Sequence, residues 1–157
     1  MLNCSFTGHR GIPSDRGFVL ALAARILWAY EQGCRNFYNG GAMGFDLLAA
    51  EQVLRLRSVH PEVRLYMILP HKGQEAKYSP EDTERYRRVL AAADGVEYTA
   101  ERYYDGVMRE RNARLSELGD ICIAYVTRAR SGSAQTARMC QRQGKPVYNI
   151  ANDLLRG

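Results

Sequence analysis

Short apolar runs alternate with longer amphipathic stretches along the whole chain, and this alternation restricts the fold more than any other feature of the sequence. Six apolar runs predict β-strands, at residues 3–7, 36–39, 63–69, 95–98, 121–126 and 146–150. Helical patterns lie between them. Strands that alternate with helices form βαβ units, so we expect the α/β class, with a mainly parallel sheet flanked by helices on both faces.

The helical stretches carry their own start and stop signals. Apolar residues recur at helical spacing over residues 19–30, and Gly33 follows as a stop. Ser79 followed by Pro80 is typical of a helix N-terminus. Three further patterns predict helices, at residues 45–56, 107–118 and 134–143. Because no repeat or linker interrupts this order, we expect one domain over residues 1–157.

Right-handed crossovers between parallel strands place every β-to-α turn on one edge of the sheet, where ligands bind near the reversal of strand order. The turn after the first predicted strand contains Thr7, Gly8, His9 and Arg10. Glycine lets a ligand approach the backbone closely, and the other three side chains donate hydrogen bonds to phosphate. We therefore expect this turn to contact an anionic ligand, and for His9 a structural role is the alternative.

The turn after the second predicted strand is rich in glycine and opens a helix. Its candidate ligand-binding residues are Gly40, Gly41, Ala42 and Gly44. Backbone amides at a helix N-terminus, together with the positive end of the helix dipole, form an anion site. Asp46 caps this helix, accepts from a ribose hydroxyl or acts as a general base, and Glu51 is the second candidate for a catalytic carboxylate. The spacing matches neither the G-x-G-x-x-G fingerprint nor a P-loop.

Hydroxyl residues and a glycine open the helix that follows the fifth predicted strand. The ligand-binding candidates in this turn are Ser131, Gly132, Ser133 and Thr136. A fourth element adds Arg109 and Asn112, which lie three residues apart on one helical face and are expected to face the same pocket. Tyr103 and Tyr104 precede them, and they either stack on a base or pack beneath a loop.

The positive charge of the chain is concentrated around this third turn. The formal net charge is +5, and residues 121–152 contain no Asp or Glu. Five of the 22 basic residues lie in that segment, and the remaining 17 are balanced by the 17 acidic residues of the chain. A local positive field suits an anionic ligand, and a solvated basic helix face is the alternative.

Composition and cysteine spacing indicate the compartment. No stretch approaches the roughly 18–20 apolar residues that span a bilayer, and residues 1–6 lack the basic region of a signal peptide. The cysteines are scattered, with no C-x-x-C pair, at Cys4, Cys34, Cys122 and Cys140. We therefore expect a cytoplasmic protein with reduced thiols, no metal site and no membrane partner.

Several of these motifs occur together and in one order along the chain. They are Thr7-Gly8-His9-Arg10, Gly40-Gly41-Ala42-Met43-Gly44-Phe45-Asp46, Arg111-Asn112 and Gly132-Ser133-Ala134-Gln135-Thr136. In this combination the sequence resembles the SLOG superfamily, the Rossmann-like group that includes the DprA/SMF proteins and the LOG phosphoribohydrolases, and within it the YpsA-like branch of bacterial proteins. The resemblance implies a Rossmann-like three-layer fold and a nucleotide-derived ligand such as ADP-ribose or an NAD derivative.

The same resemblance bears on catalysis. LOG hydrolases carry the pattern P-G-G-x-G-T-x-x-E, whose acid helps to cleave the N-glycosidic bond of a nucleotide. When Thr136 is placed on the threonine of that pattern, Met139 falls on the glutamate. The resemblance therefore argues against the LOG reaction in this chain.

Three functions stay open at this stage. We expect first a sensor or regulatory module that binds a nucleotide or nucleotide-derived phosphate ligand. The second is a nucleotide-processing hydrolase of the phosphoribohydrolase type, with Asp46 or Glu51 as the acid/base residue. The third is single-stranded DNA binding like that of DprA relatives, which the basic segment permits although aromatic and basic residues are not clearly interleaved. A homodimer is compatible with each.

Overall fold

The computed structural model of the chain describes residues 2–156 and contains every strand and helix that the sequence predicts. The strands are β1 (Leu2–Gly8), β2 (Cys34–Asn39), β3 (Arg64–His71), β4 (Gly95–Ala100), β5 (Ile121–Tyr125) and β6 (Val147–Asn149). The helices are α1 (Arg16–Glu31), α2 (Phe45–Val59), the short 3-10 helix η1 (Gln74–Lys77), α3 (Pro80–Ala92), α4 (Val107–Leu118), α5 (Gly132–Arg142) and α6 (Ile150–Arg156).

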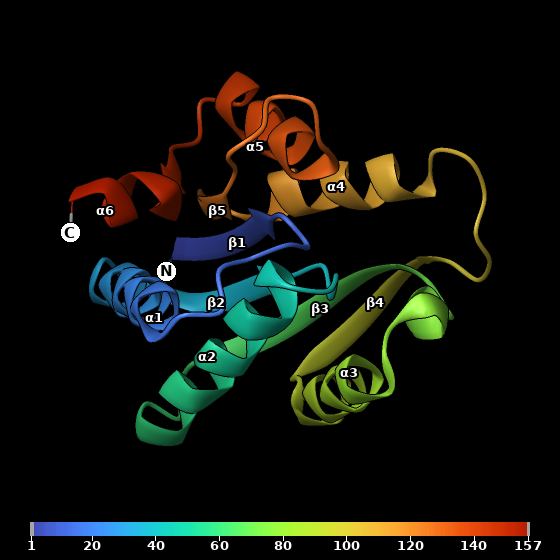
Figure 1. Cartoon of the computed structure of the whole chain (residues 1–157), viewed down its shortest axis with the longest axis horizontal. Helices are drawn as coiled ribbons and strands as arrows, with labels where there is room; N and C mark the ends of the chain where they lie inside the picture. The colour runs from blue at the N-terminus through green and yellow to red at the C-terminus, as the bar shows by residue number, and fades with distance from the viewer. Residues whose placement is uncertain (1, 157) are drawn as a thin grey trace.

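All neighbouring strands pair in parallel, and the strand order in the sheet is β4-β3-β2-β1-β5-β6. Helices α1, α2 and α3 cover one face, and α4 and α5 cover the other (Figure 1). This arrangement confirms the predicted α/β class and the Rossmann-like three-layer architecture. No helix among residues 2–156 is long and apolar enough to cross a membrane.

Local side-chain chemistry fixes where the helices begin. Asp15, Ser79 and Ser131 each stand at an N-cap and accept a hydrogen bond from a backbone amide of the first turn, at 2.8 to 3.1 Å. Such caps satisfy amides that lack a partner inside the helix, and each stabilises its helix by about 1 kcal/mol. The start of α3 at Ser79-Pro80 is therefore confirmed.

The structure contains two elements that the sequence patterns do not predict. The predicted last strand includes Ile150, but this residue begins α6 because Asn149 Oδ1 accepts from the amide of Ala151 at 3.1 Å and turns the chain. Helix α6 lies against α1, where Arg25 pairs with Asp153 at 2.8 Å. The other element, η1, follows β3 and is too short to produce a periodic pattern.

Aromatic side chains form the core beneath the carboxyl ends of the central strands. Phe6 of β1 lies against Phe37 of β2 and Phe45 of α2, with ring centroids 6.1 and 6.3 Å apart, and all three are fully buried. A Cβ atom at Gly8 would lie 2.3 Å from the Phe45 ring, so the end of β1 can pack on α2 only with glycine at that position. This contact holds the end of β1 close to the start of α2.

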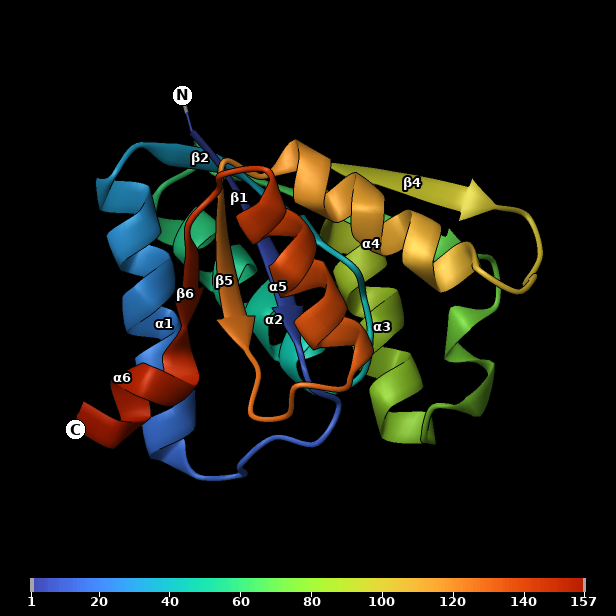
Figure 2. The same ribbon diagram turned by 90° about the horizontal axis from the view of Figure 1, so that it is seen from above.

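The strand order brings two distant turns together. Strand β1 is followed in sequence by strands on one side of it, whereas β5 returns to its other side, so the order reverses between β1 and β5. Figure 2 shows the loops that follow β1 and β5 leaving the same edge of the sheet. In open parallel sheets this position is the usual place for a ligand.

Candidate functional site

A cavity of about 390 Å³ lies at the carboxyl ends of β1 and β5, the position that the topology favours. The lining residues are Phe6, Thr7, Gly8, His9, Arg10, Ala42, Asp46, Met108, Arg111, Asn112, Leu115, Arg128, Ser131, Gly132 and Ser133. Three of these side chains are arginines, and one is a carboxylate. The three unusual turns of the sequence therefore do converge, together with one side of α4.

His9 holds the loop before α5 against the turn after β1. Its Nε2 atom accepts from the backbone amides of Thr127 at 2.8 Å and Arg128 at 3.3 Å. Because an amide can only donate, Nε2 carries no proton, and the neutral ring donates from Nδ1 to Ser133 Oγ at 2.9 Å. Burial, together with the charge of Arg128, lowers the pKa of His9 and favours this neutral form. The ring is fully engaged, so His9 positions the loop.

The start of α5 presents hydroxyl groups and backbone to the cavity. Ser131 Oγ caps the helix by accepting from Ala134 N at 3.1 Å and lies 3.2 Å from Ser133 Oγ. Thr7 Oγ1 donates to the backbone oxygen of Ser133 at 3.3 Å and ties this turn to β1. Gly132 occupies the first position of the helix and lines the cavity. This helix N-terminus therefore faces the cavity with its positive end.

Asp46 is the one carboxylate among the described residues that line the cavity, and 5% of its surface is exposed. Its Oδ2 atom accepts from the amide of Ala42 at 3.2 Å, and its backbone oxygen accepts from Asn39 Nδ2 at 2.8 Å. Its Oδ1 atom is buried and has no partner among the described residues. Burial raises the pKa of Asp46 to about 6, although the charge of Arg111 opposes the shift.

Arg111 brings a positive charge to the floor of the same cavity. Only 5% of its surface is exposed, and its Nη1 and Nε atoms donate to Gly40 O at 2.6 Å and Asn112 Oδ1 at 3.0 Å. Burial lowers its pKa and the charge of Asp46 opposes this, but a guanidinium stays protonated at physiological pH. A Cβ atom at Gly40 would lie 2.8 Å from Arg111 Nη1 and 3.0 Å from Asp46 Oδ2, so the two charges flank that residue.

The glycine-rich turn before α2 was expected to offer free backbone amides to an anion, but several of these amides are hydrogen-bonded within the protein. The amides of Gly41, Ala42 and Phe45 are already bonded, to Asn39 Oδ1, Asp46 Oδ2 and His9 O respectively. Gly44 has φ 75°, and a Cβ atom there would lie 2.0 Å from the backbone oxygen of Arg10. Of the glycines proposed as ligand contacts in this turn, none lines the cavity, whereas Ala42 does. Internal packing accounts for these glycines.

Three other candidates lie away from the cavity. Glu51 pairs with Arg85 of α3 at 2.6 Å, on the face of α2 that contacts α3. Arg109 was expected to face the same pocket as Asn112, but it is exposed on α4 and does not line the cavity. Thr136 is buried, and its hydroxyl donates to Gly132 O of its own helix at 3.1 Å. Met139, which the resemblance places on the LOG glutamate, is also absent from the lining.

Arg111 takes the position that Arg109 was expected to occupy, and the sequence contains a signal for it. The apolar residues Val107 and Leu115 are four residues to either side of Arg111 and lie on the buried face of α4. An arginine in the middle of such a stripe must be buried, and a buried charge needs a partner or a ligand. Arg109 lies two residues from Arg111 and points away.

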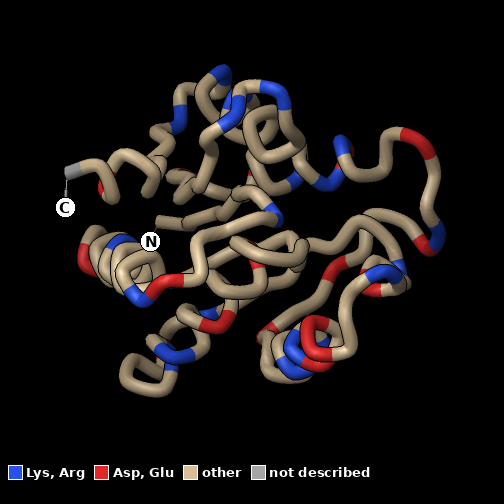
Figure 3. Tube along the Cα trace, in the orientation of Figure 1, with Lys and Arg blue, Asp and Glu red and all other residues tan. Residues whose placement is uncertain are grey.

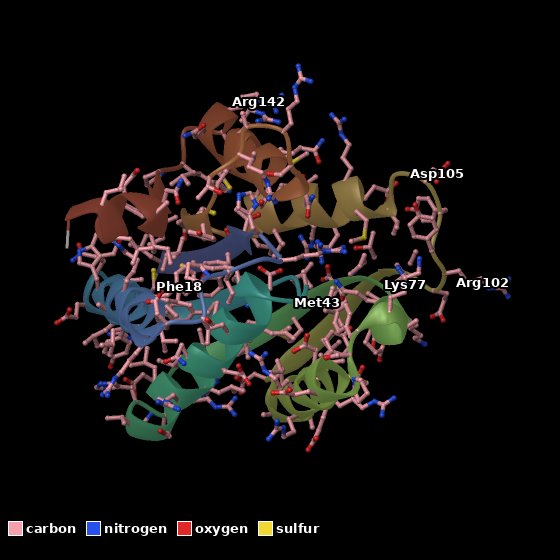
Figure 4. All side chains as sticks on the ribbon, viewed as in Figure 1. Phe18, Met43, Lys77, Arg102, Asp105 and Arg142 are labelled. Atoms are coloured by element: carbon pink, nitrogen blue, oxygen red, sulfur yellow. The ribbon has the colours of Figure 1, made fainter. Side chains whose placement is uncertain are left out.

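Tyr103 and Tyr104 lie in the connection between β4 and α4, with 62% and 40% of their surfaces exposed. They are absent from the cavity lining, and Tyr103 contacts His71 edge to face at 5.6 Å. Figure 4 shows Arg102 and Asp105 projecting from this same connection, at the far end of the molecule from α6. The two tyrosines therefore lie outside this cavity, and stacking on a base stays a prediction.

Comparisons with known proteins bear on the family of the chain. The family model YpsA, described as the YspA SLOG family, matches residues 18–151. The UPF0398 protein of Bacillus velezensis is 31% identical over 143 residues, which cover 87% of this chain and 79% of that protein. The UPF0398 protein YpsA of Bacillus subtilis is 27% identical with the same coverage. The predicted resemblance is thereby confirmed.

Solved structures share the fold. DNA processing protein A from Helicobacter pylori aligns with 99% of this chain and 72% of its own, with a TM-score of 0.66 and 23% identity, and is described as binding single-stranded DNA. DprA from Streptococcus pneumoniae aligns with 93% of this chain and 49% of its own, with a TM-score of 0.68 and 17% identity. At such identities the likeness shows a common architecture.

Proposed function

Because the chain belongs to the YspA SLOG family, we propose that the cavity between β1 and β5 binds a nucleotide-derived phosphate ligand, and that the protein acts as a sensor or regulatory module for it. The observation that carries the proposal is Asp46 Oδ1, a buried acceptor without a partner among the described residues, in a cavity that three arginines also line. A buried polar atom without a hydrogen bond is costly, and a bound ligand removes that cost.

The phosphate of the ligand fits at the side of the cavity formed by the turns. Arg10 and Arg128 are exposed at this side and offer guanidinium donors. Gly132 and Ser133 open α5 between them, so backbone amides and a helix dipole act on the same anion. Ser131 and Ser133 add hydroxyl groups. The hydrogen-bond donors on this side of the cavity therefore come from two turns, the one after β1 and the one before α5, and not from a single helix terminus alone.

The remainder of a nucleotide fits on the side formed by α4. Met108 and Leu115 of α4 and Phe6 of β1 are apolar residues of the cavity lining, together with Arg111 and Asp46. A cavity of about 390 Å³ is within the usual range for small-molecule sites. ADP-ribose and NAD derivatives combine phosphate, ribose and base, and we therefore place them first among the candidate ligands.

A thermal-shift assay with ADP-ribose, NAD, AMP and related phosphates tests this proposal. A ligand at about 100 times its dissociation constant stabilises the folded state by roughly 2.7 kcal/mol. Arg128→Gln should weaken binding at least about tenfold, which is the loss of one charge-assisted hydrogen bond. Arg142→Gln is the matched control, since Figure 4 shows Arg142 on the outer side of α5. A panel without any shift would refute the proposal, and native mass spectrometry would identify a copurified ligand.

A hydrolase is the second candidate function, and Asp46 is the residue that favours it. A carboxylate whose pKa is raised to about 6 by burial is suited to proton transfer near neutral pH. Nucleoside monophosphates incubated with the protein should then release free base, and Asp46→Asn should abolish the release. Glu51→Gln is the control, because Glu51 pairs with Arg85 outside the cavity. Equal turnover in Asp46→Asn would exclude this mechanism.

Nucleic acid is the third candidate, favoured by the charge on α5. Figure 3 shows basic residues without acidic ones over α5 and the loop before it, and Arg130, Arg138 and Arg142 are exposed there. The Helicobacter pylori protein of the same fold is described as binding single-stranded DNA. Affinity for an oligonucleotide should then fall steeply with salt, and a salt-independent signal would argue against this role.

A further inference from the structure

Asp46 is held in one orientation before any ligand arrives. Ala42 N fixes Oδ2 at 3.2 Å, and Asn39 Nδ2 fixes the backbone oxygen of Asp46 at 2.8 Å. Asn39 is itself fully buried and accepts from Gly41 N at 2.8 Å through its own Oδ1. The remaining oxygen of Asp46, Oδ1, is buried and has no partner among the described residues, and Asp46 is one of the residues that line the cavity.

The charges around Asp46 decide what kind of donor can meet it. A cationic ligand group is disfavoured because Arg10, Arg111 and Arg128 line the same cavity. The negative charge of Asp46 repels a phosphate, whereas the arginines and the N-terminus of α5 attract it. The group that faces Oδ1 is therefore a neutral donor, carried by a molecule whose anionic part lies elsewhere in the cavity.

From this geometry we propose that Asp46 binds a ribose hydroxyl and makes the cavity selective for ribonucleotides over their 2′-deoxy counterparts. This inference rests on the proposed function, because it assigns one subsite of the same ligand. A ribose lies next to the phosphate in every nucleotide, and Asp46 and Arg128 line the same cavity, so one nucleotide could offer a hydroxyl to the first and its phosphate to the second. An analogue without the hydroxyl leaves the buried carboxylate unpaired, which is the arrangement that rejects such analogues most strongly.

Matched pairs of ligands test the selectivity without any variant. Binding of AMP and 2′-deoxy-AMP, and of ADP and 2′-deoxy-ADP, is measured by calorimetry at pH 7.5. The ribonucleotide should bind at least about tenfold more tightly, because a hydrogen bond to a carboxylate contributes that factor or more. Equal affinities within a pair would overturn the selectivity and leave the proposed function standing, whereas no binding by any member would overturn both.

Asp46→Asn then tests the residue. Ala42 N needs an acceptor, so the amide oxygen of the substituted side chain would face it and the NH₂ group would face the cavity. A neutral contact is roughly half as strong as a charge-assisted one, so the preference should fall to about threefold. Arg142→Gln should keep the full preference. A folded Asp46→Asn protein with undiminished selectivity would overturn the assignment, because another group would then contact the hydroxyl.

Discussion

Replacement of His9 tests whether the cavity is held together by one imidazole. In His9→Ala, the amides of Thr127 and Arg128 lose their acceptor and Ser133 loses its donor. Three hydrogen bonds contribute about 0.5–1.5 kcal/mol each. Because Thr127 and Arg128 are exposed and water can replace part of the loss, we expect a destabilisation of about 2 kcal/mol, or about 4–8 °C in Tm for a chain of this size.

A conservative variant separates the acceptor from simple side-chain packing. The amide oxygen of glutamine can reach the place of Nε2, so His9→Gln should recover about half of the stability lost in His9→Ala. Urea unfolding followed by circular dichroism measures both, and an unchanged slope shows that the comparison is valid. His60→Gln serves as the control, because His60 is half-buried and lies outside the cavity lining. A His9→Ala protein within about 0.5 kcal/mol of the wild type would refute the reasoning.

The stability that His9 contributes should depend on pH, and urea unfolding at several pH values measures it. Burial and Arg128 lower the pKa of His9, so the folded state binds this proton less tightly than the unfolded chain does. The stability from the neutral ring is complete above the ordinary pKa of about 6.5 and is lost as pH falls through that value toward the lowered pKa. His9→Gln should remove this loss, and an identical acid limb in His9→Gln would contradict the assignment.

Three further changes probe other parts of the site. Gly44→Ala should cost about 3 kcal/mol or more in urea unfolding, because φ is 75° and the new Cβ atom would meet Arg10 O at 2.0 Å. Glu51→Gln breaks a half-exposed pair with Arg85 and should lower the free energy of unfolding by about 0–1 kcal/mol. Ligand affinity should not change, and a loss of affinity would contradict the placement of Glu51 outside the binding site. Asp46→Asn should flatten the stability change between about pH 4 and about 6, since a raised pKa gives stability below the ordinary value that is lost as pH rises through the shifted one.

The fold followed from the sequence because its determinants are local. Apolar runs and helical periodicity are read within one segment, and Ser79 before Pro80 marks a helix start on its own. The convergence of the turns followed as well, since right-handed crossovers leave no other edge for them. Strand order is different, because the neighbours β1 and β5 are separated in sequence by β2, β3, β4 and the helices between them, and none of these carries a local signal for the pairing.

Side-chain roles were harder to predict because they depend on partners far along the chain. The glycines suggested a ligand, yet Gly8 meets Phe45 and Gly44 meets Arg10, contacts that only the folded chain creates. The three-residue spacing to Asn112 favours Arg109, whereas the buried stripe of α4 contains Arg111. The hydrogen bonds of His9 to Thr127 and Ser133 fit the structural role that was the alternative for this residue.

The number of carboxylates in the cavity favours ligand binding over hydrolysis as the function of the site. Glycoside hydrolases, which cleave the bonds between sugars, ordinarily use two carboxyl groups, one as acid and one as base or nucleophile. Among the described residues that line the cavity, Asp46 alone carries a carboxyl group, and Glu51 is paired with Arg85 outside it. One carboxylate among arginines is sufficient to recognise a hydroxyl beside a phosphate. The same side chain therefore supports ligand binding more directly than hydrolysis, and the arginines account for the remainder of the recognition.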